Sequence, residues 1–363
     1  MYALRVIRLA RPWIGDEEKR AVKRVLESGM LVMGARVAEL EERLQERCER
    51  RHAVVVSSGT AALELALEAI GIGGPEDTSG DTEVLLPALS WPSPAHAIAR
   101  AGATPVLYDV DPSSWNGTPE GAKRAHSERV KAAIVIDQFG MPAADHDSGD
   151  VPLIVDAACS LGSTVDGRPA ASRGLISCLS FHPRKVLTTG EGGACLTDDE
   201  GLADLLRVLR DHGRSGGGFL RPAGNHRMTE MAAAIGLVQM DRLDGILERR
   251  RTLAARYREA LDGVSFQQPP REGVIGNGQT FGVLVDGRDA AVEALRARGV
   301  EAGRLSFAMN RIGSMKGRFR AGSETFDEAE AIEDRGMALP LHPLMSDSDQ
   351  AEVIEAFSRH FSR

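Results

Sequence analysis

Ser180-Phe-His-Pro-Arg-Lys185-Val-Leu-Thr-Thr-Gly-Glu-Gly-Gly193 is the most informative stretch of this chain. Lys185 follows a short apolar run and a Phe-His-Pro turn, and small, hydroxylic and glycine residues come after it. Glycines let the backbone approach a ligand closely, and threonines add short hydrogen-bonding side chains. A lysine on such a turn faces a cleft, as an amine needs in order to form a Schiff base with a carbonyl cofactor. An ordinary solvated loop lysine is the alternative, so other segments have to agree.

Length, composition and charge are typical of a globular enzyme and argue against several other classes. The 363 residues exceed the usual size of one core, so we expect one large and one smaller domain. The hydrophobic content of 42% comes without long apolar runs, which disfavours a membrane protein. The net charge of −8 provides no basic surface for nucleic acid, and the three arginines at 249–251 fit a solvated helix face.

The cysteines indicate a reducing compartment. Cys48, Cys159, Cys178 and Cys195 are irregularly spaced without a C-x-x-C pair, and three of them lie in or next to apolar runs. Reduced thiols fit this pattern better than disulfides or zinc ligands, so we expect no metal site. The N-terminal sequence lacks the continuous apolar core of a signal peptide, and we therefore expect a cytoplasmic protein.

Short β-rich runs alternate with helical patterns along the chain. Buried Val/Ile/Leu-rich runs between helices predict an α/β fold with a large, mostly parallel sheet. The predicted strands cover residues 53–56, 83–86, 104–110, 132–137, 153–156, 176–180 and 194–197, and the predicted helices cover residues 17–28, 35–49, 60–70, 93–101, 202–211 and 229–251. A Pro- and Gly-rich connection at 269–278 precedes a strand at 281–286 and a helix at 290–298. We predict a large domain over residues 1–250 and a smaller C-terminal α/β domain over residues 251–363.

Ser57-Ser58-Gly59-Thr60 is a candidate phosphate site. It follows an apolar strand and opens the helix Ala61-Ala-Leu-Glu-Leu-Ala-Leu67, so free amides and the positive helix end face a ligand. A plain helix N-cap is the alternative for this segment. The chain lacks the Gly-Lys-Ser/Thr spacing of a Walker loop at this point, and it lacks a G-x-G-x-x-G motif for a nicotinamide cofactor.

Asp156 and Trp91 are candidates for binding an aromatic cofactor ring. Asp156 ends an otherwise apolar strand and is followed by two alanines, so its carboxylate requires a partner. A protonated pyridine nitrogen is a suitable partner, and a helix cap or surface position is the alternative. The indole of Trp91 follows a strand end, where it either stacks on a planar ring or packs in the core.

Taken in series, these segments resemble the pyridoxal-phosphate-dependent sugar aminotransferases of the DegT/StrS type. The resemblance covers nearly the whole length. Its motifs are Ser28-Gly-Met-Leu-Val-Met-Gly34, Ser57-Ser-Gly-Thr60, Gly102-Ala-Thr-Pro-Val106, Asp109-Val-Asp-Pro112, Gln138-Phe-Gly-Met-Pro-Ala-Ala144, Asp156-Ala-Ala158, Ser180 to Gly193, Asn225-His-Arg-Met-Thr-Glu230 and Leu339-Pro-Leu-His-Pro343. The resemblance implies the aspartate-aminotransferase-like fold (fold type I of these enzymes), in which the smaller domain is C-terminal.

The resemblance also implies roles for single residues. Lys185 would form the internal aldimine with pyridoxal 5'-phosphate and move the proton between substrate carbon and cofactor, while Asp156 would pair with the pyridine nitrogen. Trp91 would stack on the ring. The phosphate contacts would come from Ser58, Gly59, Thr60 and Ser180. Asn225 would reach the cofactor phosphate of a neighbouring subunit, which implies a homodimer with shared active sites, and Arg227 is a weaker candidate for the same role.

The reaction implied is transfer of an amino group from L-glutamate to a keto group of a nucleotide-linked sugar, in ping-pong half-reactions. Three features depart from the family pattern. Cys159 stands where many members carry glutamine or histidine near the ring hydroxyl, so we expect it to contact the cofactor. The stretch 145–150 is short where relatives have a helix, and little chain separates 211–218 from Asn225. Both short stretches are expected to affect the outer substrate pocket.

Three other functions remain open at this point. A relative in the same family would use glutamine as donor and act on a cyclitol ketone or an aminobenzoate precursor. A sugar dehydratase variant of the family replaces the lysine with histidine, so Lys185 argues against it. A binding or regulatory protein on the same fold is the third alternative, and the presence of Lys185 and Asp156 argues against it too.

Overall fold

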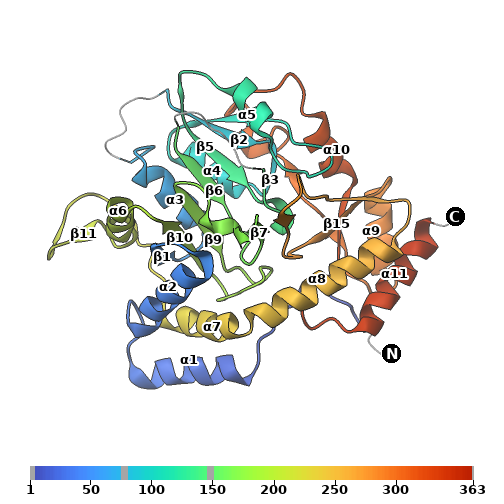
Figure 1. Ribbon diagram of the computed structural model, residues 1–363, viewed down its shortest axis with the longest axis horizontal. Helices are drawn as coiled ribbons and strands as arrows, with labels where there is room; N and C mark the ends of the chain where they lie inside the picture. Colours follow the sequence, from blue (N-terminus) through green and yellow to red (C-terminus); the bar gives the residue numbers. More distant parts are fainter. Residues whose placement is uncertain (1–4, 75–80, 145–150, 362–363) are drawn as a thin grey trace.

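An eight-stranded sheet forms the centre of the computed structural model, which describes residues 5–74, 81–144 and 151–361 (Figure 1). In spatial order its strands are β1 (His52–Val56), β10 (Gly193–Thr197), β9 (Ile176–Ser180), β6 (Leu153–Asp156), β5 (Val130–Ile136), β2 (Glu83–Pro87), β4 (Thr104–Tyr108) and β18 (Arg320–Ala321). Neighbours from β9 to β18 run parallel, and β10 is antiparallel to β9 and β1. The predicted mostly parallel sheet is confirmed, and the predicted strands end within two residues of the observed ones.

Helices cover both faces of this sheet because strand residues alternate between two cores. Val54 and Val56 pack with the helices of one face, and Ala53 and Val55 pack with those of the other. The first face carries α3 (Gly59–Ala69), α4 (Ser93–Arg100) and α6 (Glu200–Arg210), and the second carries α2 (Ala35–Cys48) and α7 (Glu230–Asp241). α1 (Asp16–Ser28) packs on the outer side of α7 (Figure 1).

The helix predicted over residues 229–251 is wrong as a single helix. The chain forms two helices, α7 and α8 (Leu243–Ala260), which meet at Arg242. The Arg242 amide donates to the Gln239 carbonyl three residues back, which tightens the last turn of α7. The Arg242 side chain pairs with Glu17 and Glu18 of α1, and these contacts hold the junction in place. No local sequence signal such as proline or glycine occupies the break.

The C-terminal part is built on a second sheet. Its strands are β13 (Ser265–Phe266), β15 (Phe281–Leu284), β19 (Gly336–Leu339) and β16 (Gly303–Arg304), and the helices α9 (Arg288–Arg296) and α11 (Asp347–Phe361) accompany it. A third core joins this part to the second half of α8. The first half of α8 packs in the core of the large sheet, so this long helix joins both parts (Figure 1). The division into domains at residue 250 stays a prediction.

Shorter elements connect these parts. They are β3 (Leu89–Ser90), α5 (Pro119–Ala125), β7 (Thr164–Val165), β8 (Arg168–Pro169), β11 (Arg214–Ser215), β12 (Gly218–Phe219), β14 (Val274–Ile275), β17 (Phe307–Ala308) and α10 (Asp327–Arg335). β17 pairs with β3 beside the large sheet. The short stretch predicted at 145–150 lies outside the described residues. Among the described helices, none has the length and apolar character needed to cross a bilayer.

Candidate active site

Lys185 lies on the turn that joins β9 to β10, as the sequence predicts. Its backbone amide donates to the His182 carbonyl at 2.8 Å, which closes the turn after Ser180. The side chain is half-buried, and Nζ donates to the Sγ of Cys159 at 2.9 Å. The structure therefore brings together a lysine and a cysteine that are 26 residues apart in the chain.

Asp156 lies at the carboxyl end of β6, beside β9, and is only 7% exposed. Its Oδ1 accepts a hydrogen bond from the Ala158 amide at 3.1 Å. Burial raises the pKa of Asp156 to about 6, although the nearby Lys185 ammonium acts in the opposite direction. A buried carboxylate with an elevated pKa is poised to pair with a cation delivered into the site.

The charges of this cluster also act on Lys185. Burial disfavours the ammonium form, but Cys159 and Asp156 outweigh that effect and raise the pKa of Lys185 above its ordinary value. Arg184 acts against them as a like charge. The site therefore groups one amine, one thiol and one carboxylate, and the charges of the thiol and the carboxylate favour the ammonium form of the amine.

The Ser58–Thr60 segment forms an anion cradle at the N-terminus of α3. Ser58 is the N-cap: its Oγ accepts from the Ala61 amide at 3.1 Å, and its carbonyl accepts from the Ala62 amide at 3.0 Å. The amides of Gly59 and Thr60 precede these donors, so they point out of the helix end. The N-cap and phosphate interpretations of the sequence are thus compatible, because the cap leaves two amides for an anion.

Two glycines allow the strand ends to approach this cradle. A Cβ on Gly59 would lie 2.7 Å from the Cβ of Ser180, so the end of β9 is in direct contact with the start of α3. A Cβ on Gly193 would lie 2.6 Å from the carbonyl carbon of Ser58, so β10 passes equally close. Only glycine fits at either position without a shift of the backbone. The Ser180 hydroxyl is thereby held next to the helix amides, and the donor set fits a phosphate group.

Trp91 lies at the rim of the same region. It stands between β3 and α4, two residues before Ser93, whose hydroxyl is hydrogen-bonded to that of Thr60 in the cradle. The indole is 65% exposed and makes an edge contact with Phe307, with ring centroids 5.6 Å apart. The core-packing alternative is therefore wrong, and the face of the indole is open for a planar ring.

Asn225 is placed differently from the other predicted residues. Its side chain is exposed, and the described residues show no contact between Asn225 and either Lys185 or Asp156. The carbonyl of the next residue, His226, accepts a hydrogen bond from the Ser57 amide at 2.8 Å, so this segment runs beside the cradle. Arg227 is paired with Asp211. A role across a subunit interface is outside what one chain tests, and it stays a prediction.

Several residues that support the site were missed by sequence reasoning. Asp137 is fully buried at the end of β5, where it pairs with Arg173 at 2.5 Å and accepts from the Ser160 hydroxyl at 2.5 Å. Through Ser160 it holds the turn that follows Asp156. Asp137, like Asp156, stands at the end of an apolar run that forms a strand, so this sequence pattern could have identified it. Glu230 caps α2 from a distance of more than 190 residues in the chain, and no local pattern predicts that contact.

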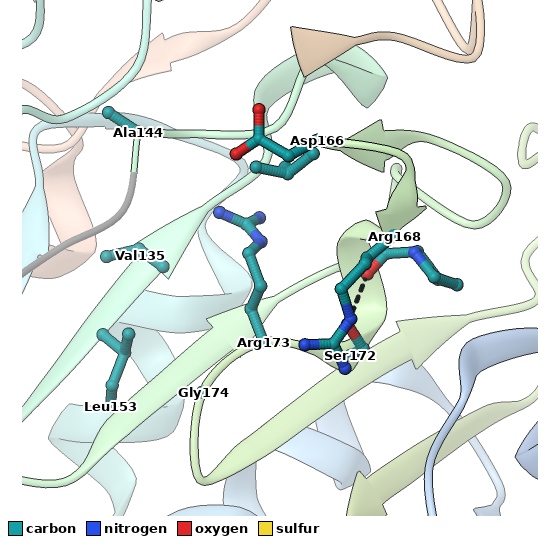
Figure 2. A pocket seen from close by; sticks show the side chains of 10 residues that line it. Val135, Ala144, Leu153, Asp166, Arg168, Ser172, Arg173 and Gly174 are labelled. Atoms are coloured by element: carbon teal, nitrogen blue, oxygen red, sulfur yellow. Dashed lines mark hydrogen bonds between the residues drawn. The ribbon is translucent and has the colours of Figure 1, made fainter. Parts of the chain in front are cut away.

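Two cavities elsewhere in the described residues, of about 390 and 510 Å³, contain none of the predicted site residues. Figure 2 shows the first, with Asp166, Arg168 and Arg173 at its wall. The second lies between the end of α2 and the α7–α8 junction. Neither brings a nucleophile together with an anion site. The Lys185 cluster and the adjoining cradle combine these features, so this region is the candidate active site.

Comparisons with known proteins identify the family of this chain. Residues 12–358 match the model of the DegT/DnrJ/EryC1/StrS aminotransferase family. The aminotransferase TlmJ from Streptoalloteichus hindustanus is 32% identical, with a TM-score of 0.88 over 98% of this chain and 99% of its own. DesV from S. venezuelae is 29% identical, with a TM-score of 0.88 over 96% of this chain and 95% of the DesV chain. Spr1654 from Streptococcus pneumoniae is 25% identical; it is described as a putative sugar aminotransferase and has been solved in PMP and PLP forms. Its PMP form has a TM-score of 0.89 over 98% of this chain and 97% of the Spr1654 chain.

The family match spans nearly the whole chain, and the structural matches cover both the large sheet and the C-terminal part. These findings confirm the predicted fold class, the transaminase activity and pyridoxal 5'-phosphate as the cofactor. The chain belongs to the DegT/DnrJ/EryC1/StrS aminotransferase family.

Proposed function

We propose that this aminotransferase moves an amino group from L-glutamate to a keto group of a nucleotide-linked sugar, in two half-reactions at one site. The observation that carries the proposal is the contact of Lys185 Nζ with Cys159 Sγ at 2.9 Å, beside the buried Asp156 carboxylate. One lysine in such a cluster serves both half-reactions, because each requires a proton to be removed and returned on the same face. The description of Spr1654 as a sugar aminotransferase supports the sugar class.

Pyridoxal 5'-phosphate, when bound, supplies a carbonyl that accepts the amino group and a conjugated ring that takes up electrons from the substrate carbon. Asp156 provides the negative charge opposite the pyridine nitrogen. Its carboxyl has a pKa of about 6, so it is largely ionised at neutral pH even before a cation reaches it. Lys185 takes the proton from the substrate carbon and delivers it to the neighbouring position.

The remaining residues bind and orient. The amides of Gly59 and Thr60, with the hydroxyls of Ser58 and Ser180, would hold the phosphate at the positive end of α3. Trp91 would cover one face of the ring with its exposed indole. Cys159, which accepts a hydrogen bond from Lys185 Nζ, would contribute its thiol to the binding of the cofactor ring.

We further propose a homodimer with shared active sites, in which Asn225 reaches the neighbouring subunit's phosphate. An exposed apolar loop at residues 30–33 supports an interface, since its four side chains are between 37% and 57% exposed in one chain. Glu230 anchors this loop by accepting from the amides of Gly34, Arg36 and Val37, each at 2.9 Å. The exposed side chains of Phe219, in β12, and of Leu220, the next residue, add to the same argument. Cytoplasmic location is also proposed, and the four free cysteines support it.

A single-turnover measurement tests the donor and the half-reaction. Holoenzyme mixed with L-glutamate alone, without a sugar, should release about one equivalent of 2-oxoglutarate per active site and then stop, because the acceptor is missing. Lys185→Ala should release none. If glutamine gives the burst and glutamate does not, the cyclitol or aminobenzoate-type alternative is correct. If the protein binds the cofactor and neither donor reacts, the binding or regulatory alternative is correct.

The acceptor requires a second step. Enzyme loaded by glutamate and freed from excess donor is mixed with keto-sugar nucleotides one at a time, and products are read by mass. Replacement of oxygen by an amino group identifies the acceptor. Amination of free ketones with no turnover of any keto-sugar nucleotide would contradict the proposed substrate class while leaving the aminotransferase activity intact.

A further inference from the structure

The connection between α8 and β15 reaches the candidate active site. Asn277 is fully buried in this connection, and both protons of its amide are used. Nδ2 donates to the Cys159 carbonyl at 2.7 Å and to the Leu161 carbonyl at 2.9 Å. Its Oδ1 accepts from the Gln279 amide at 2.8 Å. Asn277 therefore fixes the turn that carries Cys159.

Gln279, two residues further on, contacts the backbone beside the lysine. It is 7% exposed, and its Nε2 donates to the Arg184 carbonyl at 2.5 Å. That carbonyl belongs to the peptide group that immediately precedes Lys185. The amide on the other side of this peptide group, that of Lys185 itself, donates to the His182 carbonyl at 2.8 Å. The peptide unit is thus held from both sides, which sets the direction in which the lysine side chain leaves the backbone.

The segment is itself anchored to α8. Arg250 is 3% exposed, and its guanidinium donates to the carbonyls of Gly278, Gln279 and Leu341 at 3.3, 3.1 and 3.1 Å. Gly278 has a φ of +71°, and a Cβ there would lie 3.0 Å from the Arg250 carbonyl oxygen. The close approach to α8 and the left-handed backbone both require glycine at this position. Residues 277–279 therefore form a bracket that joins α8 to the turn carrying Cys159 and to the turn carrying Lys185.

We propose that Gln279 is a positioning residue for Lys185: through the Arg184 carbonyl it keeps Nζ against the Cys159 thiol, on the turn that Asn277 holds. Gln279 acts through the peptide group and touches no reacting atom. Its Oε1 is buried without a hydrogen-bond partner among the described residues, so an amide here costs free energy that an apolar side chain would avoid. The amide is needed at this position because its Nε2 donates the hydrogen bond to the Arg184 carbonyl. The proposal rests on the proposed role of Lys185.

The test measures the protonation of Lys185 in the full-length, cofactor-free protein. The variant is Gln279→Met, which keeps the length of the side chain and removes the donor. Gln350→Met is the matched control, because Gln350 is also buried, also donates Nε2 to one carbonyl (Leu253, 2.6 Å) and also has an unpartnered Oε1 among the described residues. Each protein is pulse-labelled with acetic anhydride across a pH series, and the labelled fraction of Lys185 is read by peptide mass.

The charged and titratable groups that act on the amine are Cys159, Asp156 and Arg184. If Gln279→Met lets Nζ move away from the first two, the pKa of Lys185 falls. The labelling midpoint should therefore fall, so labelling at a fixed pH below the midpoint becomes faster than in the wild-type protein. Gln350→Met should keep the wild-type profile. Gln279→His, which retains an N–H donor of similar reach, should restore the wild-type midpoint.

Two results would overturn the proposal: an unchanged midpoint in Gln279→Met, or an equal change in Gln279→Met and Gln350→Met. Circular dichroism and thermal unfolding establish that each variant is folded. Should Gln279→Met fail to fold, Gln279→Leu takes its place and is read in the same way. The labelling assay uses no cofactor and no substrate, so its failure is distinguishable from failure of the proposed function, which the 2-oxoglutarate burst measures.

Discussion

Replacing Asp156 by asparagine should stabilise the cofactor-free protein while disabling the enzyme. The carboxylate is buried at the end of β6, and burial raises its pKa from 3.8 to about 6. Because the pKa of Asp156 is higher in the folded than in the unfolded state, its carboxyl does not lower the free energy of unfolding below pH 3.8, where it is protonated in both states. As the pH rises from 3.8 to about 6, the buried carboxyl increasingly lowers the free energy of unfolding, and above pH 6 this destabilisation is complete. The two pKa values correspond to a destabilisation of about 3 kcal/mol.

An asparagine at this position would keep the oxygen that accepts from the Ala158 amide and would carry no charge. Asp156→Asn should therefore raise the free energy of unfolding by up to about 3 kcal/mol above pH 6, and leave it unchanged near pH 4. Under the proposed role of Asp156, turnover of the holoenzyme should fall about a hundredfold or more, since the pyridine nitrogen would lose the charge opposite it. Urea unfolding of the cofactor-free proteins at the two pH values measures the first effect, and single-turnover kinetics the second.

Asp137→Asn is the matched control for this experiment. Asp137 is also buried at a strand end, but it is paired with Arg173 and hydrogen-bonded to Ser160 and the Ala143 amide. Breaking that pair removes the carboxylate from the partly buried Arg173 guanidinium, so this variant should lose about 1–3 kcal/mol of unfolding free energy at neutral pH. The two substitutions are chemically identical and should have opposite signs. A loss of stability in Asp156→Asn above pH 6 would refute the reasoning from burial.

The proposed catalytic role of Lys185, the support of α2 by Glu230 and the proposed sharing of active sites can each be tested separately. Borohydride reduction of the holoenzyme should place the pyridoxyl group on Lys185, as read by peptide mass, and an adduct on any other residue would remove Lys185 from its proposed role. Glu230→Gln should lower the free energy of unfolding by about 2 kcal/mol, because the charge that serves three amides of α2 and the loop before it is lost, whereas the exposed Glu248→Gln should have no measurable effect in the same urea titration. Mixing inactive Lys185→Ala and Asn225→Ala subunits should restore about a quarter of the wild-type activity through mixed dimers with one intact site, and no recovery after verified subunit exchange would contradict shared sites.

The large sheet and the chemistry at its strand ends could be predicted from the sequence. Buried parallel strands are short apolar runs, and their residues alternate between two cores without long-range information. The same local logic applies to Asp156, whose carboxylate interrupts an apolar run, and to Ser58, whose hydroxyl precedes a helix. Lys185 stands out because glycines and threonines surround it. Each of these signals lies within a few residues of the group that it identifies.

Only the tertiary structure decided how these groups are held. The contact between Lys185 and Cys159, the cap of α2 by Glu230 and the bracket formed by residues 277–279 join segments that are 26 to 196 residues apart. The exposure of Trp91 and the break at Arg242 likewise depend on what packs against them. Hydrogen bonds and burial of this kind are properties of pairs of distant segments, and a single sequence carries no periodicity or spacing that records them. The residue types of the candidate site can therefore be predicted from the sequence, whereas their distances and contacts are set only when the chain folds.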